Sequence, residues 1–261
     1  MIDKSAPNVS SSDSLAKRSC VKKPWGYEFE YFENTDVSIW VLCMGYMHKS
    51  GYLMDDSKTS FHMHEHKSST VLCIDGAIMV ETFSGANILR PFESTKVSSK
   101  EFHRVSSYLN YGIALEIESP NDRNDIARLF DSHGRVNKGY DWNHSDLSDL
   151  SILKSEVDFS NNFPNLTLID AETGVSSLQI YNKNNTTYIT GVSVDQLVQT
   201  YDSGSVFICT EGKLIDKNNK TILLPSSVYV VENLAMLSER FFAHNHGLAN
   251  LSGFIVTSYA A

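Results

Sequence analysis

The chain has 261 residues, of which 41% are hydrophobic and 20% charged, an ordinary composition for a globular protein with one large or two small domains. Its formal net charge of −9 gives no basic footprint, so we expect no binding to nucleic acid or to an anionic membrane surface. No apolar run reaches the length of a membrane span, the first residues lack the apolar core of a signal peptide, and the four cysteines form no C-x-x-C pair. These features predict a cytoplasmic protein with buried, reduced thiols.

The first half of the chain alternates short β-type runs with polar or glycine-containing turns. A Ser-rich, polar stretch at residues 1–20 precedes them, and we expect it to be a disordered arm. The runs lie at 27–32, 37–45, 59–64, 70–75, 77–83, 87–89, 96–98, 103–106 and 113–117. Strands this short and regularly spaced predict an antiparallel barrel or sandwich. A short helix is predicted at 122–130, where Asp122 or Asn124 can cap the first turn.

The second half repeats this rhythm after a polar linker at 137–165, within which 147–157 predicts a short helical turn. Its β-type runs lie at 178–181, 187–191, 206–210, 213–215, 221–224, 228–231, 241–243 and 254–257. The segment from Cys209 to Gly212 is similar to that from Cys73 to Gly76, since each has an apolar run followed by a turn glycine. We therefore predict two copies of one β fold, at residues 21–136 and 166–261.

Three histidines in the first half have the spacing of a metal site. His62 and His64 are two residues apart in a predicted strand, so their side chains lie on the same face. His103 follows about forty residues later, far enough for hairpins to bring it back beside the first pair. Neutral imidazole is the commonest metal ligand in proteins. The pattern therefore predicts that His62, His64 and His103 bind one divalent metal ion, with Zn, Fe, Mn and Ni left open.

Three segments of the first half resemble a known family. They are Lys23-Pro-Trp-Gly-Tyr-Glu28, Thr59-Ser-Phe-His-Met-His-Glu-His-Lys67, and Glu116-Ile-Glu-Ser119 followed by Asp125 to Arg135. In order and spacing they resemble the cupin domain of type II mannose-6-phosphate isomerases. The cupin superfamily consists of small β-barrels that hold a metal through histidines and a glutamate. The second half carries no such signature, so the resemblance implies an all-β bicupin (two double-stranded β-helix barrels) with a degenerate second barrel.

The chain departs from the family pattern at the carboxylate ligand. Counted back from Gly76, the family's metal-binding glutamate falls at Ser69. Three neutral imidazoles can still bind Zn or Fe(II). Glu65, Glu101 or Glu81 can supply a carboxylate from elsewhere, and spacing selects none of them.

The resemblance implies a sugar-phosphate or nucleotide-sugar isomerase or epimerase of polysaccharide precursor synthesis. Such an enzyme needs a metal, a base and an anchor for an anionic sugar. Lys67 and Arg135 occupy the family's positions for contacts with the anion, and Arg128 has either this role or one in a salt bridge. Two alternatives remain: a three-His Fe(II) dioxygenase, and a non-catalytic sugar-binding or assembly module. We also expect a homodimer, since open edges of β-barrels often pair.

Overall fold

The computed structural model describes residues 20–23, 25–45, 57–131, 165–169, 177–181, 185–193, 204–211, 214–215, 221–223, 225–230 and 252–260. Every regular element among them is a β-strand, and each pairing of strands is antiparallel. The prediction of an all-β fold is therefore confirmed. The described residues include no helix that is both long and apolar enough to span a membrane.

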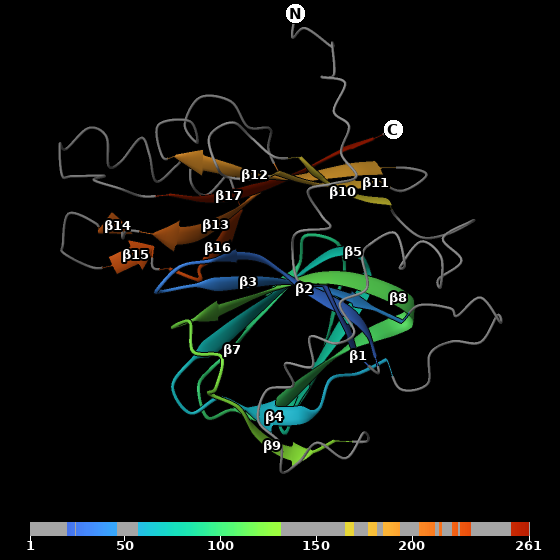
Figure 1. Cartoon of the computed structure of the whole chain (residues 1–261), viewed down its shortest axis with the longest axis vertical. Coiled ribbons are helices and arrows are strands. Elements are labelled where there is room, and N and C mark those ends of the chain that lie inside the picture. The colour runs from blue at the N-terminus through green and yellow to red at the C-terminus, as the bar shows by residue number, and fades with distance from the viewer. Residues whose placement is uncertain are drawn as a thin grey trace, which may run out of the picture.

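The first sheet contains nine strands and comes entirely from the first half of the chain. Its strands are β1 (Cys20–Lys23), β2 (Gly26–Glu33), β3 (Ser38–Met44), β4 (Phe61–Met63), β5 (Ser68–Thr82), β6 (Gly85–Leu89), β7 (Ser94–Val97), β8 (His103–Ser119) and β9 (Ala127–Phe130). They follow the order β1-β2-β3-β8-β4-β9, and β5 pairs with β6, β7 and β8. Because the long strands β5 and β8 exchange partners along their length, the sheet curls around an interior (Figure 1).

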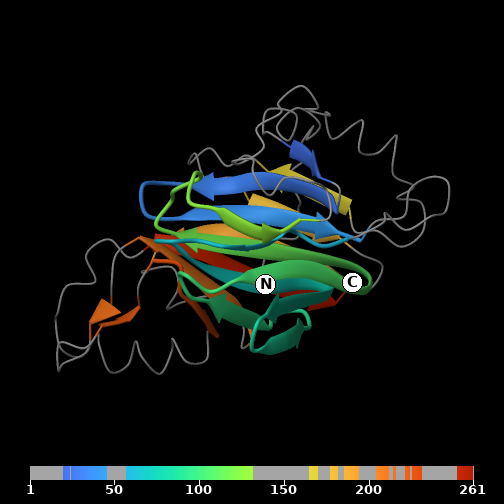
Figure 2. The ribbon, with the colours of Figure 1, turned by 90° about the horizontal axis from the view of Figure 1, so that it is seen from below.

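The second sheet contains six strands from the second half, in the order β10-β11-β12-β17-β13-β16. These strands are β10 (Asn165–Ile169), β11 (Ser177–Tyr181), β12 (Asn185–Ser193), β13 (Val206–Glu211), β16 (Val228–Val230) and β17 (Ser252–Ala260). A separate pair is formed by β14 (Leu214–Ile215) and β15 (Thr221–Leu223). In Figure 2 the strands of the first sheet lie in front of those of the second.

Alternation along the central strands gives the first sheet two apolar faces. On β3, Ile39 and Val41 join a core that also contains Leu178 and Val256 of the second sheet. The intervening Trp40 and its neighbours at alternate positions belong to a second cluster, which contains residues of the first half alone. One face of the curled sheet thus packs on the second sheet, while the other lines the interior. The domain boundaries at 136 and 166 stay predictions.

Two predicted runs, 70–75 and 77–83, form one strand in the structure. Gly76 lies inside β5, with register shifts on either side of it. Its φ is +69°, and a Cβ atom there would lie 2.4 Å from the carbonyl oxygen of Tyr111. The glycine therefore marks a bulge that bends a continuous strand, where the sequence predicted a turn between two strands.

The helix predicted at 122–130 is wrong. Asp122 makes a local turn instead, because its Oδ1 accepts the backbone N–H of Asn124 at 3.0 Å. The chain then continues as β9, which pairs with the open edge of β4. A partner strand distant in sequence has outweighed the local helical signal. Residues 1–19 of the arm predicted at 1–20, the helical turn at 147–157 and the strand at 241–243 lie outside the described residues, while Cys20 begins β1.

Candidate metal centre

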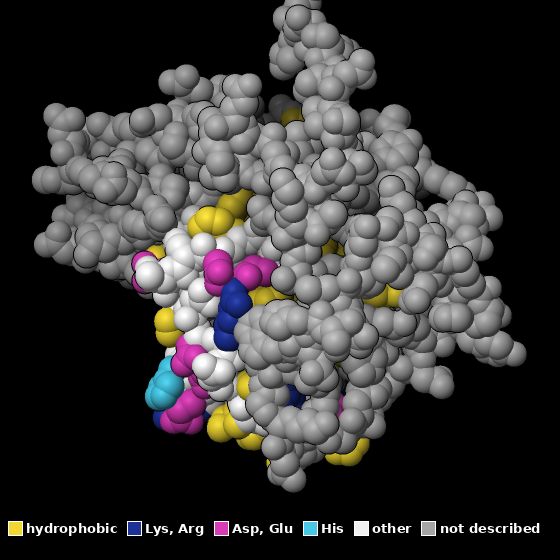
Figure 3. Space-filling view, viewed as in Figure 1, with side chains coloured by type: hydrophobic (Ala, Val, Ile, Leu, Met, Phe, Trp, Pro, Cys, Tyr) yellow, Lys and Arg dark blue, Asp and Glu magenta, His cyan; other side chains and the backbone are white. Residues whose placement is uncertain are grey.

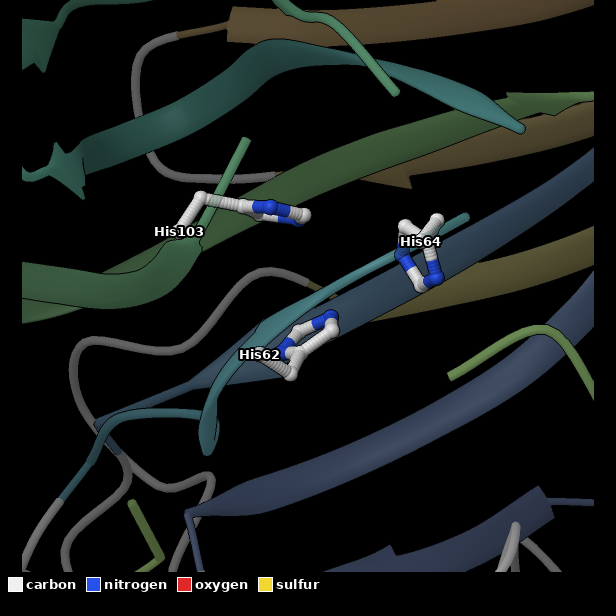
Figure 4. Close-up of side chains that lie close together, drawn as sticks. All are labelled: His62, His64 and His103. Atoms are coloured by element: carbon white, nitrogen blue, oxygen red, sulfur yellow. The ribbon is translucent and has the colours of Figure 1, made fainter. Parts of the chain in front are cut away.

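The structure brings His62, His64 and His103 together. His62 lies in β4 and is the cross-strand partner of His103, the first residue of β8, so both side chains project from the same face. His64 follows β4 directly. Their ring centroids are 4.5 to 5.4 Å apart, and one ring nitrogen from each lies within 4.8 Å of one from each of the others. Figure 4 shows the three rings facing a common space.

Each histidine is held by a backbone carbonyl at its Nδ1 atom. The acceptors for His62, His64 and His103 are the carbonyl oxygens of Ser60, Asp125 and Glu101, at 2.8, 2.5 and 3.1 Å. A carbonyl only accepts hydrogen bonds, so each Nδ1 carries the proton and each Nε2 carries the lone pair. This is the arrangement of metal-ligating histidines, whose second nitrogen is anchored by an outer hydrogen bond.

Burial keeps these three rings neutral. Their exposed fractions are 7%, 3% and 1% in chain order. Burial, followed by the positive charge of Lys67, lowers the pKa of His64 to about 3. Burial is also the main cause that lowers the pKa of His62 and of His103. Neutral imidazole is the form that binds metal, so all three are ready to ligate at pH 7.

The free nitrogens fit a metal better than they fit a packed core. Nε2 of His64 and Nε2 of His103 are buried without a hydrogen-bond partner among the described atoms. An unsatisfied buried polar atom is costly and calls for a ligand that satisfies it. Metal–nitrogen bonds are about 2.0–2.1 Å long, so ligating nitrogens stand at most about 4.2 Å apart. Small inward shifts of the three rings meet that limit, and the residues present therefore fit a metal ion.

Asp125 fixes the turn that carries His64. Its carboxylate accepts the backbone N–H groups of Glu65, His66 and Lys67, at 2.6, 2.8 and 2.9 Å. Burial raises the pKa of Asp125, but these three donors outweigh it and leave the pKa below its usual range. The segment after β4 is thereby locked by one side chain.

A cavity of about 70 Å³ opens beside the histidines. Its wall combines two tryptophans, four cationic side chains and three carboxylates with His62 and His64; these groups are Trp25, Trp40, Lys23, Lys67, Arg123, Arg128, Glu28, Glu116 and Glu118. Two buried ion pairs belong to its wall, Lys67–Glu118 at 2.6 Å and Lys23–Glu28 at 3.0 Å. On the outer surface, Figure 3 shows acidic and basic side chains next to one another along the described part of that face.

Among the described residues, Glu118 brings a carboxylate close to His64, and sequence reasoning did not select it. Its Oε1 lies 3.6 Å from Nε2 of His64. Of the candidates that spacing left open, Glu65 pairs with Lys100 at the surface and Glu81 pairs with Arg104. Glu101 accepts the backbone N–H of Ser98 at 3.3 Å.

Glu118 was missed because only the register of β5 against β8 places it near the histidines. The available signal was the Glu116-Ile-Glu118 alternation, which puts both carboxylates on one face of a strand.

The three residues predicted to contact an anion differ in where the structure places them. Lys67 is 4% exposed, and its ammonium group is paired with Glu118, so a role in substrate binding stays a prediction. Arg135 lies outside the described residues. Arg128, on β9, is the cross-strand partner of His62 and lines the cavity.

Glu116 is a second carboxyl of the cavity wall that sequence reasoning did not select as a site residue. Burial and then the charge of Glu118 raise its pKa to about 8. A carboxyl group that keeps its proton near neutral pH inside a cavity is suited to acid–base chemistry.

Parts of several solved structures are similar to this one. KdgF from a Halomonas species matches with a TM-score of 0.32 and 14% identity, over 37% of this chain and 79% of KdgF. A cupin-2 domain containing protein from Shewanella frigidimarina matches with a TM-score of 0.28 and 11% identity, over 34% of this chain and 74% of that one. A sugar phosphate isomerase from a cupin superfamily, from Silicibacter pomeroyi, matches with a TM-score of 0.30 and 10% identity, over 36% of this chain and 58% of the isomerase. No family model and no curated protein matches the chain.

Proposed function

We propose that this chain is a cupin-type, metal-dependent isomerase or epimerase that acts on a small anionic sugar of polysaccharide precursor synthesis. The observation that carries the proposal is the triad of neutral histidines. Each donates Nδ1–H to a backbone carbonyl, so that three Nε2 lone pairs are left for one ion. A packing role for buried histidines would not leave two of these atoms without a partner.

The cavity beside the triad holds the groups that an isomerase needs. A bound divalent metal supplies Lewis-acid stabilisation of negative charge on a substrate oxygen. Glu116 lies on the wall with a pKa of about 8, so its carboxyl oxygens both hold and accept a proton near neutral pH. Proton transfer between the two carbons of an aldose–ketose pair is the step this group would serve. Trp25 and Trp40 give the cavity an apolar wall against which a sugar ring can pack.

Arg128 is the described cation best placed to bind an anionic substituent. Its position opposite His62 on the neighbouring strand puts it at the wall of the cavity. A guanidinium group binds phosphate through two parallel hydrogen bonds. We propose the same role for Lys67 and Arg135, the two residues selected from the sequence.

Elemental analysis of the purified full chain tests the metal site. We expect close to one Zn, Fe, Mn or Ni per chain, and none in a His64→Ala/His103→Ala variant. Proton NMR in D2O with a panel of sugar phosphates then tests the reaction, since an isomerase replaces a carbon-bound hydrogen with solvent deuterium. A wild-type chain that stays metal-free after reloading would overturn the enzymatic proposal and favour a sugar-binding or assembly module.

One observation favours a second candidate, a three-His Fe(II) dioxygenase. The group of ligand atoms within 4.8 Å of one another contains histidines and no carboxylate. Three neutral imidazoles are a ligand set that suits Fe(II) as well as Zn. Oxygen consumption by the Fe(II)-loaded protein with a carbohydrate substrate, without deuterium exchange, would favour this candidate over the isomerase.

A further inference from the structure

We propose that Glu118 supplies the carboxylate ligand of the metal centre from a strand next to the one that carries Ser69, and that Lys67 competes with the metal for it. This inference rests on the metal binding proposed above. It concerns which side chain completes the ligand set and what occupies that side chain when no metal is bound.

The register of two strands puts Glu118 where residue 69 would otherwise act. Ser69 on β5 and Glu118 on β8 are direct cross-strand partners, and such partners project from the same face of an antiparallel pair. Ala114 lies on this interior face of β8, whereas Leu115 and Ile117 point into the core shared with the second sheet. A carboxylate at 118 therefore projects into the space that a longer side chain at 69 would enter.

The side chain of Ser69 is too short to fill this space, so the space is open to Glu118. The serine side chain is short and only 1% exposed, and its Oγ has no hydrogen-bond partner among the described atoms. Glu118 is also buried, at 8% exposure. A glutamate at position 118 of β8, in place of one at position 69 of β5, therefore keeps a carboxylate on the interior face of the first sheet.

Glu118 lies outside the group of three histidines whose ligand atoms are within 4.8 Å of one another, but its distance from His64 suits two ligands of one ion. Oε1 of Glu118 lies 3.6 Å from Nε2 of His64, too far for a hydrogen bond. Two atoms bound tetrahedrally to one ion at about 2.1 Å stand about 3.4 Å apart. A carboxylate also offsets charge that three neutral imidazoles leave uncompensated on a buried dication.

Lys67 forms an ion pair with the same oxygen, Oε1 of Glu118. Its Nζ is 2.6 Å from Oε1 of Glu118, and both side chains are buried. The ammonium group neutralises a carboxylate that would otherwise be a costly buried charge. A dication that binds Oε1 repels this ammonium group, so Lys67 lowers the affinity of the site for metal. The other carboxylate oxygen accepts the hydroxyl of Ser38 at 3.4 Å and fixes the orientation of the group.

The test compares metal affinities of the full chain by competition with a chromophoric chelator, together with the absorption spectrum of the Co²⁺-loaded protein. Glu118→Gln is expected to weaken Zn²⁺ binding by at least roughly 10–100-fold, the loss typical of an outer hydrogen-bond partner of a ligand, and to change the Co²⁺ bands. Lys67→Met is expected to tighten binding in the wild-type background and to have no effect beside Glu118→Gln. Glu65→Gln, a change at a surface carboxylate paired with Lys100, is the matched control and should leave both measurements unchanged.

Two further variants keep the result interpretable if Glu118→Gln folds poorly. Glu118→Asp retains the charge but shortens its reach, and should still weaken binding. Ser69→Glu in the Glu118→Gln background should restore affinity, because it returns a carboxylate to the same face. Unchanged affinity and an unchanged Co²⁺ spectrum in Glu118→Gln would overturn this inference and leave the three-His site standing. No metal binding by the wild-type chain would overturn both.

Discussion

Asp125 holds His64 and the turn after it through two different groups of one residue. Its carbonyl oxygen accepts Nδ1–H of His64 at 2.5 Å, while its carboxylate accepts the N–H groups of the next three residues. The orientation of the His64 ring and the path of the chain that follows it are therefore set together. Changes at residue 125 should affect both stability and metal affinity.

Asp125→Ala is expected to destabilise the fold by about 1–3 kcal/mol, because three backbone donors lose a charged acceptor. Metal affinity should fall as well, since the turn that carries His64 is released. Urea denaturation and chelator competition measure the two effects. Asp36→Ala, at an exposed position, is the control and should change neither. A loss of stability with full metal affinity would show that the carbonyl contact alone orients His64.

Glu116→Gln should change how stability depends on pH. The pKa of Glu116 in the folded protein is about 8, above the ordinary value of 4.5. A group with a raised pKa binds its proton more tightly in the folded state, so its contribution to stability is full below about pH 4.5 and is lost as the pH rises through 8. Denaturation between pH 5 and 9, with EDTA present, should show the wild type losing stability relative to the variant. Parallel curves would contradict the raised pKa.

Gly26→Ala should be strongly destabilising because of a steric clash. The glycine has a φ of +144°, and a Cβ atom would lie 2.0 Å from the carbonyl oxygen of Cys43 on the paired strand. Gly85→Ala is the matched control: its φ is +151°, but a Cβ atom would meet nothing within 4 Å. Thermal denaturation should show a loss of about 1–3 kcal/mol at Gly85 from the backbone conformation alone, and a larger loss at Gly26. Equal losses would contradict the close approach of β2 and β3.

Metal should stabilise the folded chain through the three histidines. A ligand that binds only the folded state at 100 times its Kd adds about 2.7 kcal/mol to the free energy of unfolding. We therefore expect Zn²⁺ to raise the Tm of the wild type and EDTA to reverse the change. His103→Ala should abolish the shift, whereas His66→Ala, at an exposed residue, should retain it. A shift that survives His103→Ala would place the binding elsewhere.

The sequence by itself determined the β class and the face on which the first two histidines of the triad lie. The β class follows from short apolar runs between turns and the shared face from a period of two, and both are local properties of the chain. Runs such as the one that became β3 needed only their short, apolar character between polar turns to be recognised. The same period predicted that His62, in β4, and His64, directly after it, lie on one side of the chain.

Only the tertiary structure decided which residues lie opposite one another on strands that are distant in the sequence. The pairing of His62 with His103 completed the triad, and the pairing of Ser69 with Glu118 brought an unselected carboxylate to it. The free edge of β4 turned a segment with a helix-capping residue into β9. Gly76 became a bulge because β8 pairs on both sides of it. Hydrogen bonds between strands fix these relations, and such bonds join residues whose separation along the chain leaves no periodic trace.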